Sequence, residues 1–150
     1  MNMNQKYVKV GLILVAILAT VTISGCIGDS NEFTKEANVE GVTFHVPSDY
    51  NLENTQDNGI NKEYTYSDGT NNILFFYYPG ASLDLILSQM KDTPAIFNIK
   101  ENVTYGGITG HSAEGSTSKI FVFEKSGKTF AIEMSSSLDF EEYVPKILGK

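Results

Sequence analysis

The stretch Ile73–Tyr78, ILFFYY, decides the fold because it is apolar at both odd and even positions. A short run of this kind, ended by Pro79-Gly80, predicts a β-strand that is buried on both faces of its sheet. The stretch Lys119–Glu124, KIFVFE, repeats the pattern later in the chain. Two such strands need cover on both sides of one sheet, so the sequence predicts further layers packed against that sheet.

Alternating segments on either side of these two strands predict the rest of the sheet. Residues 42–46, VTFHV, alternate apolar and polar side chains, which is typical of a half-buried strand. The same period of two occurs in residues 62–67, 98–105 and 129–134, and residues 108–114 predict a weaker strand that is poor in apolar side chains. Most neighbouring segments are joined by turn dipeptides, namely Asp68-Gly69, Gly106-Gly107 and Ser126-Gly127. We therefore expect hairpins and a mainly antiparallel sheet, and we interpret residues 48–59 as a loop with at most a short strand near Leu52.

Two amphipathic helices are available to cover this sheet. Ser82 is a good N-cap, and apolar residues follow it at helical spacing through residues 83–91. Asp139 and Glu142 form a capping-box pattern before a second apolar stripe, in which Pro145 is expected to kink or split the helix. The predicted fold class is α+β, with a mainly antiparallel sheet flanked by two helices.

The start of the chain differs in character from the rest. Lys6 and Lys9 precede a run without charge, Val10–Ile23, and Ser24, Gly25 and Cys26 follow. The order aliphatic, small, small, cysteine resembles the lipobox of prokaryotic lipoproteins. This resemblance implies that residues 1–25 are a signal peptide and that the sulfur of Cys26 receives a diacylglycerol. Residues 26–38 are then expected to form a lipidated, flexible tether to a domain that spans residues 39–150.

A plain membrane anchor is the alternative interpretation of this start. Val10–Ile27 has 18 residues without charge, which is just long enough to span a bilayer. Lys6 and Lys9 would then keep the N-terminus inside. Both interpretations place the chain after Cys26 on the outer face of the cytoplasmic membrane; a third, a cytosolic protein with a buried apolar helix, does not.

The remainder of the chain resembles a known group of domains. The leading strand in GVTFHVPSDY (residues 41–50), the helix after Pro79-Gly80, the hairpin GGITGHSAE (residues 106–114) and the C-terminal helix look like the PsbP-like fold. That resemblance implies an α/β/α sandwich with an accessory or binding role, and it supplies no catalytic residues. It rests on a pattern of elements and contains no sharp motif.

Charge and cysteine content exclude several classes of function. From Cys26 onward, nine lysines oppose 18 acidic residues, and the chain contains no arginine. Nucleic acids are bound through Lys and Arg that meet phosphates, so we expect no nucleic-acid partner. With Cys26 as its single cysteine, the chain cannot form an internal disulfide.

Few residues suggest a catalytic, metal-binding or modification site. His45 and His111 are the only histidines, and we expect both to be exposed or half-exposed and neither to be catalytic or metal-binding. Oxygen-rich clusters occur at residues 57–61 and 68–72, where we expect hairpin turns, with a weak cation site as the alternative. Asn102-Val103-Thr104 is a candidate glycosylation sequon.

The sequence thus predicts a membrane-tethered, extracytoplasmic binding or accessory module that is not an enzyme and needs no cofactor. Its expected partners are the membrane, through the lipid on Cys26, and an envelope protein. Two alternatives stay open: a hydrolase acting on envelope material, and a carrier of a weakly bound cation or small ligand. Tyrosine and phenylalanine residues between positions 64 and 78 are expected to pack in the core, with an exposed aromatic binding patch as the other interpretation.

Overall fold

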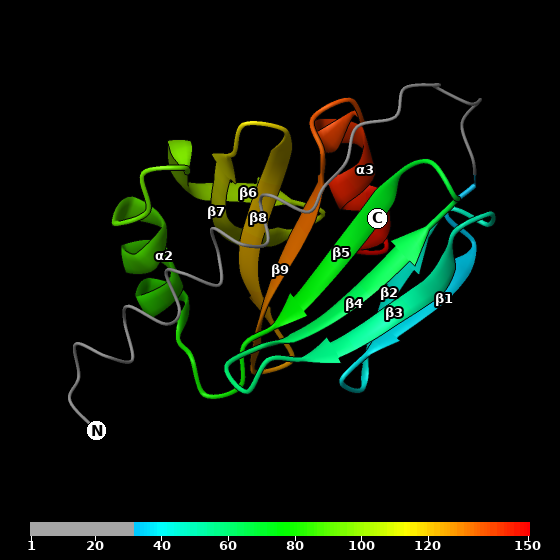
Figure 1. The fold of residues 1–150 in the computed structure, drawn as a ribbon, viewed down its shortest axis with the longest axis horizontal. Helices are drawn as coiled ribbons and strands as arrows, with labels where there is room; N and C mark the ends of the chain where they lie inside the picture. The colour runs from blue at the N-terminus through cyan, green and yellow to red at the C-terminus, as the bar shows by residue number, and fades with distance from the viewer. Residues whose placement is uncertain (1–31) are drawn as a thin grey trace.

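A computed structural model describes residues 32–150 and shows the predicted α+β fold (Figure 1). Seven antiparallel strands form one sheet in the order β3-β4-β5-β9-β8-β7-β6, and β1 and β2 form a separate hairpin. The strands are β1 (Lys35–Val39), β2 (Val42–Val46), β3 (Asn51–Asp57), β4 (Lys62–Ser67), β5 (Asn72–Tyr77), β6 (Phe97–Tyr105), β7 (Ile108–Glu114), β8 (Ser118–Lys125) and β9 (Lys128–Ser135), and the helices are α2 (Leu83–Lys91) and α3 (Phe140–Ile147).

The doubly apolar strand β5 lies near the middle of the sheet, between β4 and β9. Ile73 and Phe75 point to one face and Leu74 and Phe76 to the other, and all four side chains are buried. Strand β8 is buried on both faces in the same way. The prediction that these two stretches need cover on both sides is confirmed.

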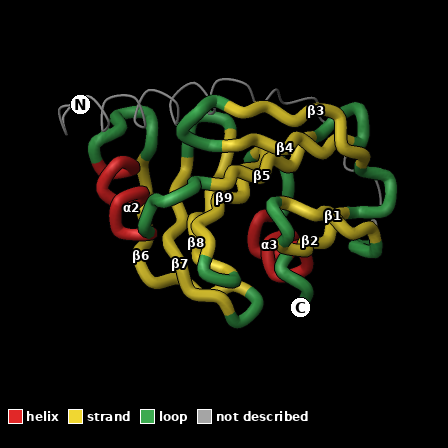
Figure 2. The backbone as a smooth tube through the Cα atoms, turned by 90° about the horizontal axis from the view of Figure 1, so that it is seen from below, coloured by secondary structure: helices red, strands yellow, loops and turns green. Residues whose placement is uncertain are grey.

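Different elements cover the two faces (Figure 2). Helix α2 packs over β6, β7 and β8, where its Ile86 and Met90 join Ile120 and Val122 in one apolar cluster. Helix α3 and the β1–β2 hairpin cover the opposite face. There Phe44 of β2 lies against the rings of three sheet residues, Phe75, Phe123 and Phe130, with centroid distances of 5.0, 6.0 and 5.2 Å.

Two boundaries expected from the sequence are wrong. The segment interpreted as a loop contains β3, whose seven residues are all exposed, because this edge strand is held through its pairing with β4 and buries no apolar side chain. The tether was expected to extend to residue 38, but β1 already begins at Lys35, and the amide of Ser48 donates to the carbonyl of Glu32 at 3.0 Å. Glu32, seven residues before the expected start of the domain at residue 39, therefore already belongs to the folded part.

Helix α3 begins as predicted and continues past its proline. The side chain of Asp139 accepts from the amide of Glu142, which confirms the N-cap. Pro145 lies inside one continuous helix and does not split it, although it supplies no N–H for an intrahelical hydrogen bond. Within residues 32–150, neither helix has both the length and the apolar character needed to cross a membrane.

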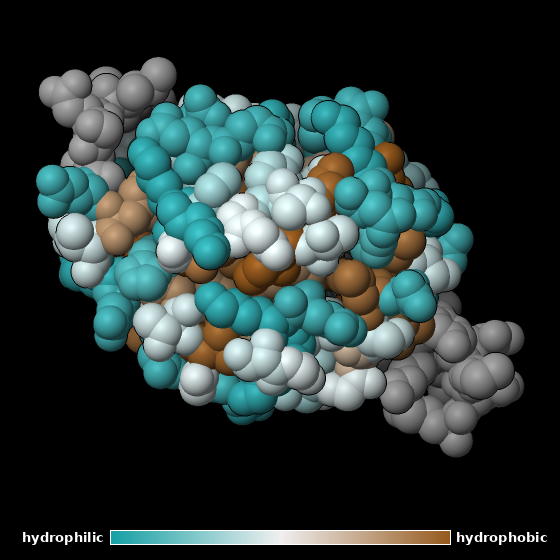
Figure 3. Space-filling view, turned by 180° about the vertical axis from the view of Figure 1, so that it is seen from behind, coloured by the Kyte–Doolittle hydropathy of each residue, from teal (hydrophilic) through white to brown (hydrophobic). Residues whose placement is uncertain are grey.

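The outer surface of the sandwich is mostly hydrophilic where Figure 3 shows it, with smaller apolar areas between the polar side chains. Among the described residues, the large apolar side chains that are well exposed are Leu52 and Phe97. They lie on β3 and β6, the two opposite edges of the sheet, so they do not form one patch.

Replacing Phe44 by Ala should lower the free energy of unfolding by about 3–5 kcal/mol, because it removes a fully buried ring from the aromatic cluster. Urea denaturation measures the change. Thr43→Ala, at the neighbouring exposed position of β2, is the matched control and should change stability little. Equal stability of the Phe44→Ala variant and the parent would contradict the role of the hairpin as a core layer.

Candidate functional site

Three turns lie together at one end of the sheet (Figure 1, lower edge). They are Glu40-Gly41 between β1 and β2, residues 58–61 between β3 and β4, and Ser126-Gly127 between β8 and β9. We call this the turn end. Residues of different hairpins meet at this end, since Lys62 and Lys128 both contact Glu40.

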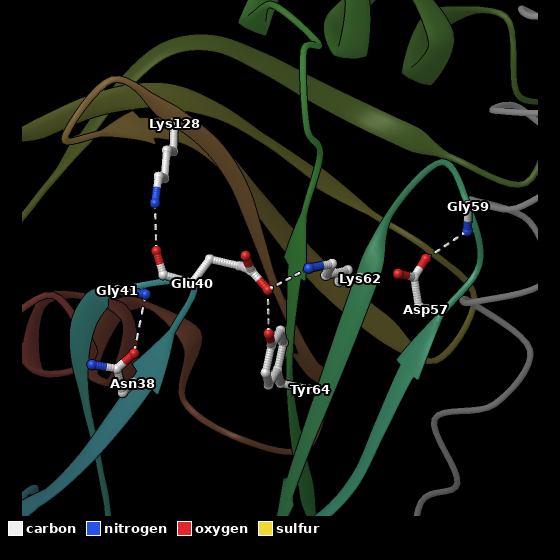
Figure 4. Close-up of polar contacts among 8 residues, drawn as sticks. All are labelled: Asn38, Glu40, Gly41, Asp57, Gly59, Lys62, Tyr64 and Lys128. Atoms are coloured by element: carbon white, nitrogen blue, oxygen red, sulfur yellow. Dashed lines mark hydrogen bonds and ion pairs between the residues drawn. The ribbon is translucent and has the colours of Figure 1, made fainter.

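Glu40 is the centre of the polar contacts at the turn end (Figure 4). Its Oε1 accepts from Tyr64 Oη at 2.6 Å and from Lys62 Nζ at 3.0 Å, and its carbonyl accepts from Lys128 Nζ. Glu40 has φ of 52°, a left-handed conformation that is unusual for a residue with a side chain. These contacts hold a strained turn residue in place and join the hairpin to β4 and β9.

The contacts also fix the protonation states of the site. Hydrogen bonds from Tyr64 and Lys62 lower the pKa of the Glu40 carboxyl. Burial, together with the hydrogen bond to Glu40, raises the pKa of Tyr64 to about 12. At neutral pH the carboxylate is ionised and the phenol keeps its proton. The arrangement is therefore suited to presenting fixed charges and donors, and it does not favour proton transfer.

Two further lysines at this end are held against the hairpin and the sheet. Lys125 Nζ donates to the carbonyl of Thr43 at 3.3 Å and lies 5.1 Å from the centre of the Phe44 ring. Lys128 Nζ lies 5.9 Å from the centre of the Tyr77 ring. An otherwise acidic domain thus places three ammonium groups, those of Lys62, Lys125 and Lys128, at the turn end, and two of them, Lys62 and Lys128, contact Glu40.

A buried carboxyl lies elsewhere in the sheet. Glu133 of β9 stands between Leu74 of β5 and Ile120 of β8, and it is 1% exposed. Burial raises its pKa to about 8, and the nearby Ser118 hydroxyl offsets only part of this rise. Within the described part of the chain, Oε1 of Glu133 has no hydrogen-bond partner. Such a group is costly to ionise, so we expect it to be neutral at neutral pH.

Sequence reasoning missed Glu133 as a special residue. It occupies the polar parity of a strand whose other parity carries Phe130, Ile132 and Met134, so alternation suggests a solvent-facing side chain. The strand is central, however, and both of its faces are buried. Its burial depends on the pairing of β9 with β5 and β8, which the local pattern does not reveal.

The two histidines do not form a site together. His111 of β7 is buried, against the expectation of an exposed or half-exposed ring, because β7 lies between β6 and β8. Its Nδ1 accepts from the amide of Asn102 at 3.3 Å. His45 lies on β2, in the hairpin on the other side of the sheet. Among the residues that the structure describes, no group of three or more His, Cys, Asp or Glu side chains is arranged to hold a metal ion.

The oxygen-rich clusters form the predicted hairpin turns. Asp57 Oδ1 accepts from the amide of Gly59 at 2.8 Å, and Asp68 Oδ1 accepts from the amides of Thr70 and Asn71 at 2.7 and 2.6 Å. These oxygens therefore stabilise the local backbone. Aromatic core packing is observed as well, since Tyr66, Phe75, Phe76 and Tyr78 are buried.

The candidate glycosylation site lies on a distorted edge strand. Asn102 is exposed on β6, with φ of 55°, where the pairing with β7 shifts between Lys100 and Val103. Thr104, the third residue of the sequon, is exposed too. The sequon is thus accessible, and modification of Asn102 stays a prediction.

The predicted lipidation site, Cys26, lies outside the described residues.

Comparison with known proteins gives no relative: no protein-family model, no curated protein and no solved structure matches this chain. The resemblances to the lipobox and to the PsbP-like fold therefore depend on the sequence patterns given above.

A double-mutant cycle of Glu40→Gln and Tyr64→Phe should give a coupling free energy of about 1 kcal/mol at pH 7, because the short hydrogen bond joins a carboxylate to a half-buried phenol. Folding lowers the pKa of Glu40, so its stabilising contribution is present above the unfolded value near 4.5 and is lost as pH falls through the folded value. The same cycle with Tyr66→Phe, which does not contact Glu40, should give coupling near zero. Equal coupling in both cycles would contradict the contact.

Glu133→Gln should change the pH dependence of stability. Since folding raises the pKa of Glu133 from about 4.5 to about 8, the unfolded state loses this proton first, and stability falls as pH rises between these values. In the parent, Glu133 should lower the free energy of unfolding by up to about 1.4 kcal/mol per pH unit in this range. A glutamine does not titrate, so the variant should lack this part of the pH dependence. Urea denaturation at pH 5, 6, 7 and 8 measures the difference. Parallel profiles for parent and variant would refute the assignment, and Glu124→Gln, at an exposed position of β8, is the control.

Proposed function

We propose that this chain is a lipoprotein anchored by Cys26 to the outer face of the cytoplasmic membrane, where its α+β domain acts as a binding or accessory module. The observation that carries the proposal is the order Ile23-Ser24-Gly25-Cys26 directly after a charge-free apolar run. The apolar run serves export, the small residues give a peptidase access to the bond before Cys26, and the thiol takes the lipid.

The boundary of the folded domain is compatible with cleavage at this site. Glu32 already takes part in the fold through its hydrogen bond with Ser48. Removal of residues 1–25 would leave every described strand and helix complete, because β1 begins at Lys35. The mature protein would then keep its whole folded domain and need the acyl chains as its anchor.

The turn end supports a binding role. Its charged groups are held by hydrogen bonds and ring contacts, so little side-chain entropy is lost when a partner binds there. A protein of the cell envelope is the proposed partner. The PsbP-like resemblance implies a role of the same kind, and a glycan on Asn102 would lie on the exposed edge strand β6 without altering the turn end.

Intact mass of the protein extracted from membranes tests the anchor. The parent should begin at residue 26 and be heavier by a diacylglycerol, with or without a further acyl chain, because one chain alone holds a protein at the membrane only marginally. Cys26→Ser should give an unlipidated precursor that still begins at residue 1. A parent chain that begins at Met1 without added mass would overturn the proposal and favour a plain membrane anchor.

A second variant separates the motif from the mere presence of a thiol. Cys26→Ser combined with Ser30→Cys keeps one cysteine but moves it four residues beyond the lipobox. This variant should also remain unlipidated. Lipid on the relocated thiol would show that the motif does not direct the modification.

A further inference from the structure

We propose that the domain is held with one particular end toward the lipid surface, so that the turn end faces away from the membrane. The membrane-facing end is formed by Glu32, Ser48 and the turn between β4 and β5, and we call it the Glu32 end. This inference rests on the proposed function, since it needs an anchor at or near Cys26. It places the lipid surface next to the Glu32 end and leaves the turn end for the partner.

The position of the chain where the described fold begins is well defined. The carbonyl of Glu32 accepts from the amide of Ser48 at 3.0 Å, and the ring of Phe33 packs edge-on against Tyr143 with centroids 5.0 Å apart. Lys146 Nζ lies 5.5 Å from the centre of the Phe33 ring. These contacts tie the beginning of the domain both to the segment that follows β2 and to α3, so its direction relative to the sheet is fixed.

The same end contains the turn that joins β4 to β5. Tyr50, which follows Ser48 closely, is buried and hydrogen-bonds to the carboxylate of Asp68 in that turn. Lys35 Nζ donates to the carbonyl of Tyr50 at 2.8 Å. Figure 1 shows this end at the upper right, on the opposite side of the molecule from the three loops of the turn end.

The chain between Cys26 and Glu32 is too short to allow the domain to turn over. Five residues, 27–31, separate the two positions, so their Cα atoms are at most about 20–22 Å apart. Strand β8 alone, from Ser118 to Lys125, extends over about 23 Å, and the turns project beyond it. An inverted domain, with the turn end on the lipid surface and the Glu32 end farthest from it, would lift Glu32 at least this far, which exceeds the reach of a fully extended tether. A domain lying on its side is opposed by the repulsion between its acidic surface and an anionic leaflet.

Attraction between the Glu32 end and lipid is not required for this orientation. Phe33 is partly buried against Tyr143, and Lys146 is paired with Glu142, so neither presents a free apolar or cationic group to a bilayer. The short tether therefore sets the orientation. Its consequence is that the turn end, which contains Glu40, Lys62 and Lys128, lies on the side of the domain away from the lipid, where an envelope partner can approach.

Tryptophan fluorescence can measure this orientation, because the chain contains no tryptophan. Ser48→Trp places a probe at the Glu32 end, just after β2. Thr43→Trp places one on β2, closer to the turn end. Both positions are exposed. Each lipidated variant is reconstituted into vesicles in which part of the phospholipid carries a nitroxide on its headgroup. Quenching of the Ser48→Trp signal should exceed that of Thr43→Trp by about twofold or more, given a strand rise of about 3.3 Å per residue between them.

Equal quenching of the two probes, or stronger quenching at Thr43, would overturn the inference. A twenty-residue Gly/Ser insertion between residues 31 and 32 gives the matched control: it should make the two signals nearly equal, because a long flexible linker no longer restricts the domain. If the difference survives the insertion, attraction to lipid sets the orientation and the tether argument fails. The intact mass of the same preparations reports lipidation of Cys26 independently, so failure of the anchor and failure of the orientation are distinguishable.

Discussion

The pairing of β5 with β9 is the constraint on which the rest of this structure depends. These are the only sheet neighbours among the described strands that are not consecutive in the chain, and their register sets Phe75 opposite Ile132 and Phe76 opposite Ala131. Without this pairing, β3–β5 and β6–β9 would be two small antiparallel sheets, each with an apolar edge open to water. When β5 pairs with β9, both strands become buried on both faces. This double burial requires helix α2 on one side of the sheet and helix α3 with the β1–β2 hairpin on the other.

Apolar and polar contacts contribute differently to the docking of the β1–β2 hairpin on the sheet. Burial of the Phe44 ring supplies most of the attraction between hairpin and sheet, since a buried aromatic side chain is worth several kcal/mol whereas exposed ion pairs contribute little. The contacts of Glu40 with Lys62, Tyr64 and Lys128 add direction, because they are formed in one position of the hairpin on the sheet. The same groups form the turn end, so the surface offered to a partner is fixed by the contacts that position the hairpin.

Most of the sheet and both helices could be predicted from the sequence, because β5, β8 and β9 carry dense apolar patterns and the helices carry clear caps. What could not be predicted depends on pairing between distant segments. Strand β3 contributes exposed side chains alone, and β1 buries only Ala37 and Val39, so neither gives a local signal strong enough to separate it from a loop or a tether. The burial of His111 and of Glu133 also depends on distant segments: β7 lies between β6 and β8 and is contacted by helix α2, whereas β9 becomes internal only when it pairs with β5. Of the candidate site, the sequence indicated the turns at residues 57–61 and 126–127 but not the turn at Glu40-Gly41. The meeting of Glu40 with Lys62, Tyr64 and Lys128 requires the hairpin to dock.

The charge of the domain gives the short tether a physical consequence. Residues 32–150 contain nine lysines and 17 acidic residues, so the domain and an anionic leaflet repel each other. At physiological ionic strength this repulsion is screened within about 8 Å, which is well inside the reach of the segment between Cys26 and Glu32. The domain can therefore stand clear of the surface while it remains anchored, and repulsion opposes its lying flat against the lipid. Lys62, Lys125 and Lys128 of the turn end are held by contacts within the domain, as Lys146 is near the other end, so free cationic groups do not distinguish the two ends. The difference lies in the tether, because the five residues between Cys26 and Glu32 keep the turn end away from the leaflet in the proposed arrangement.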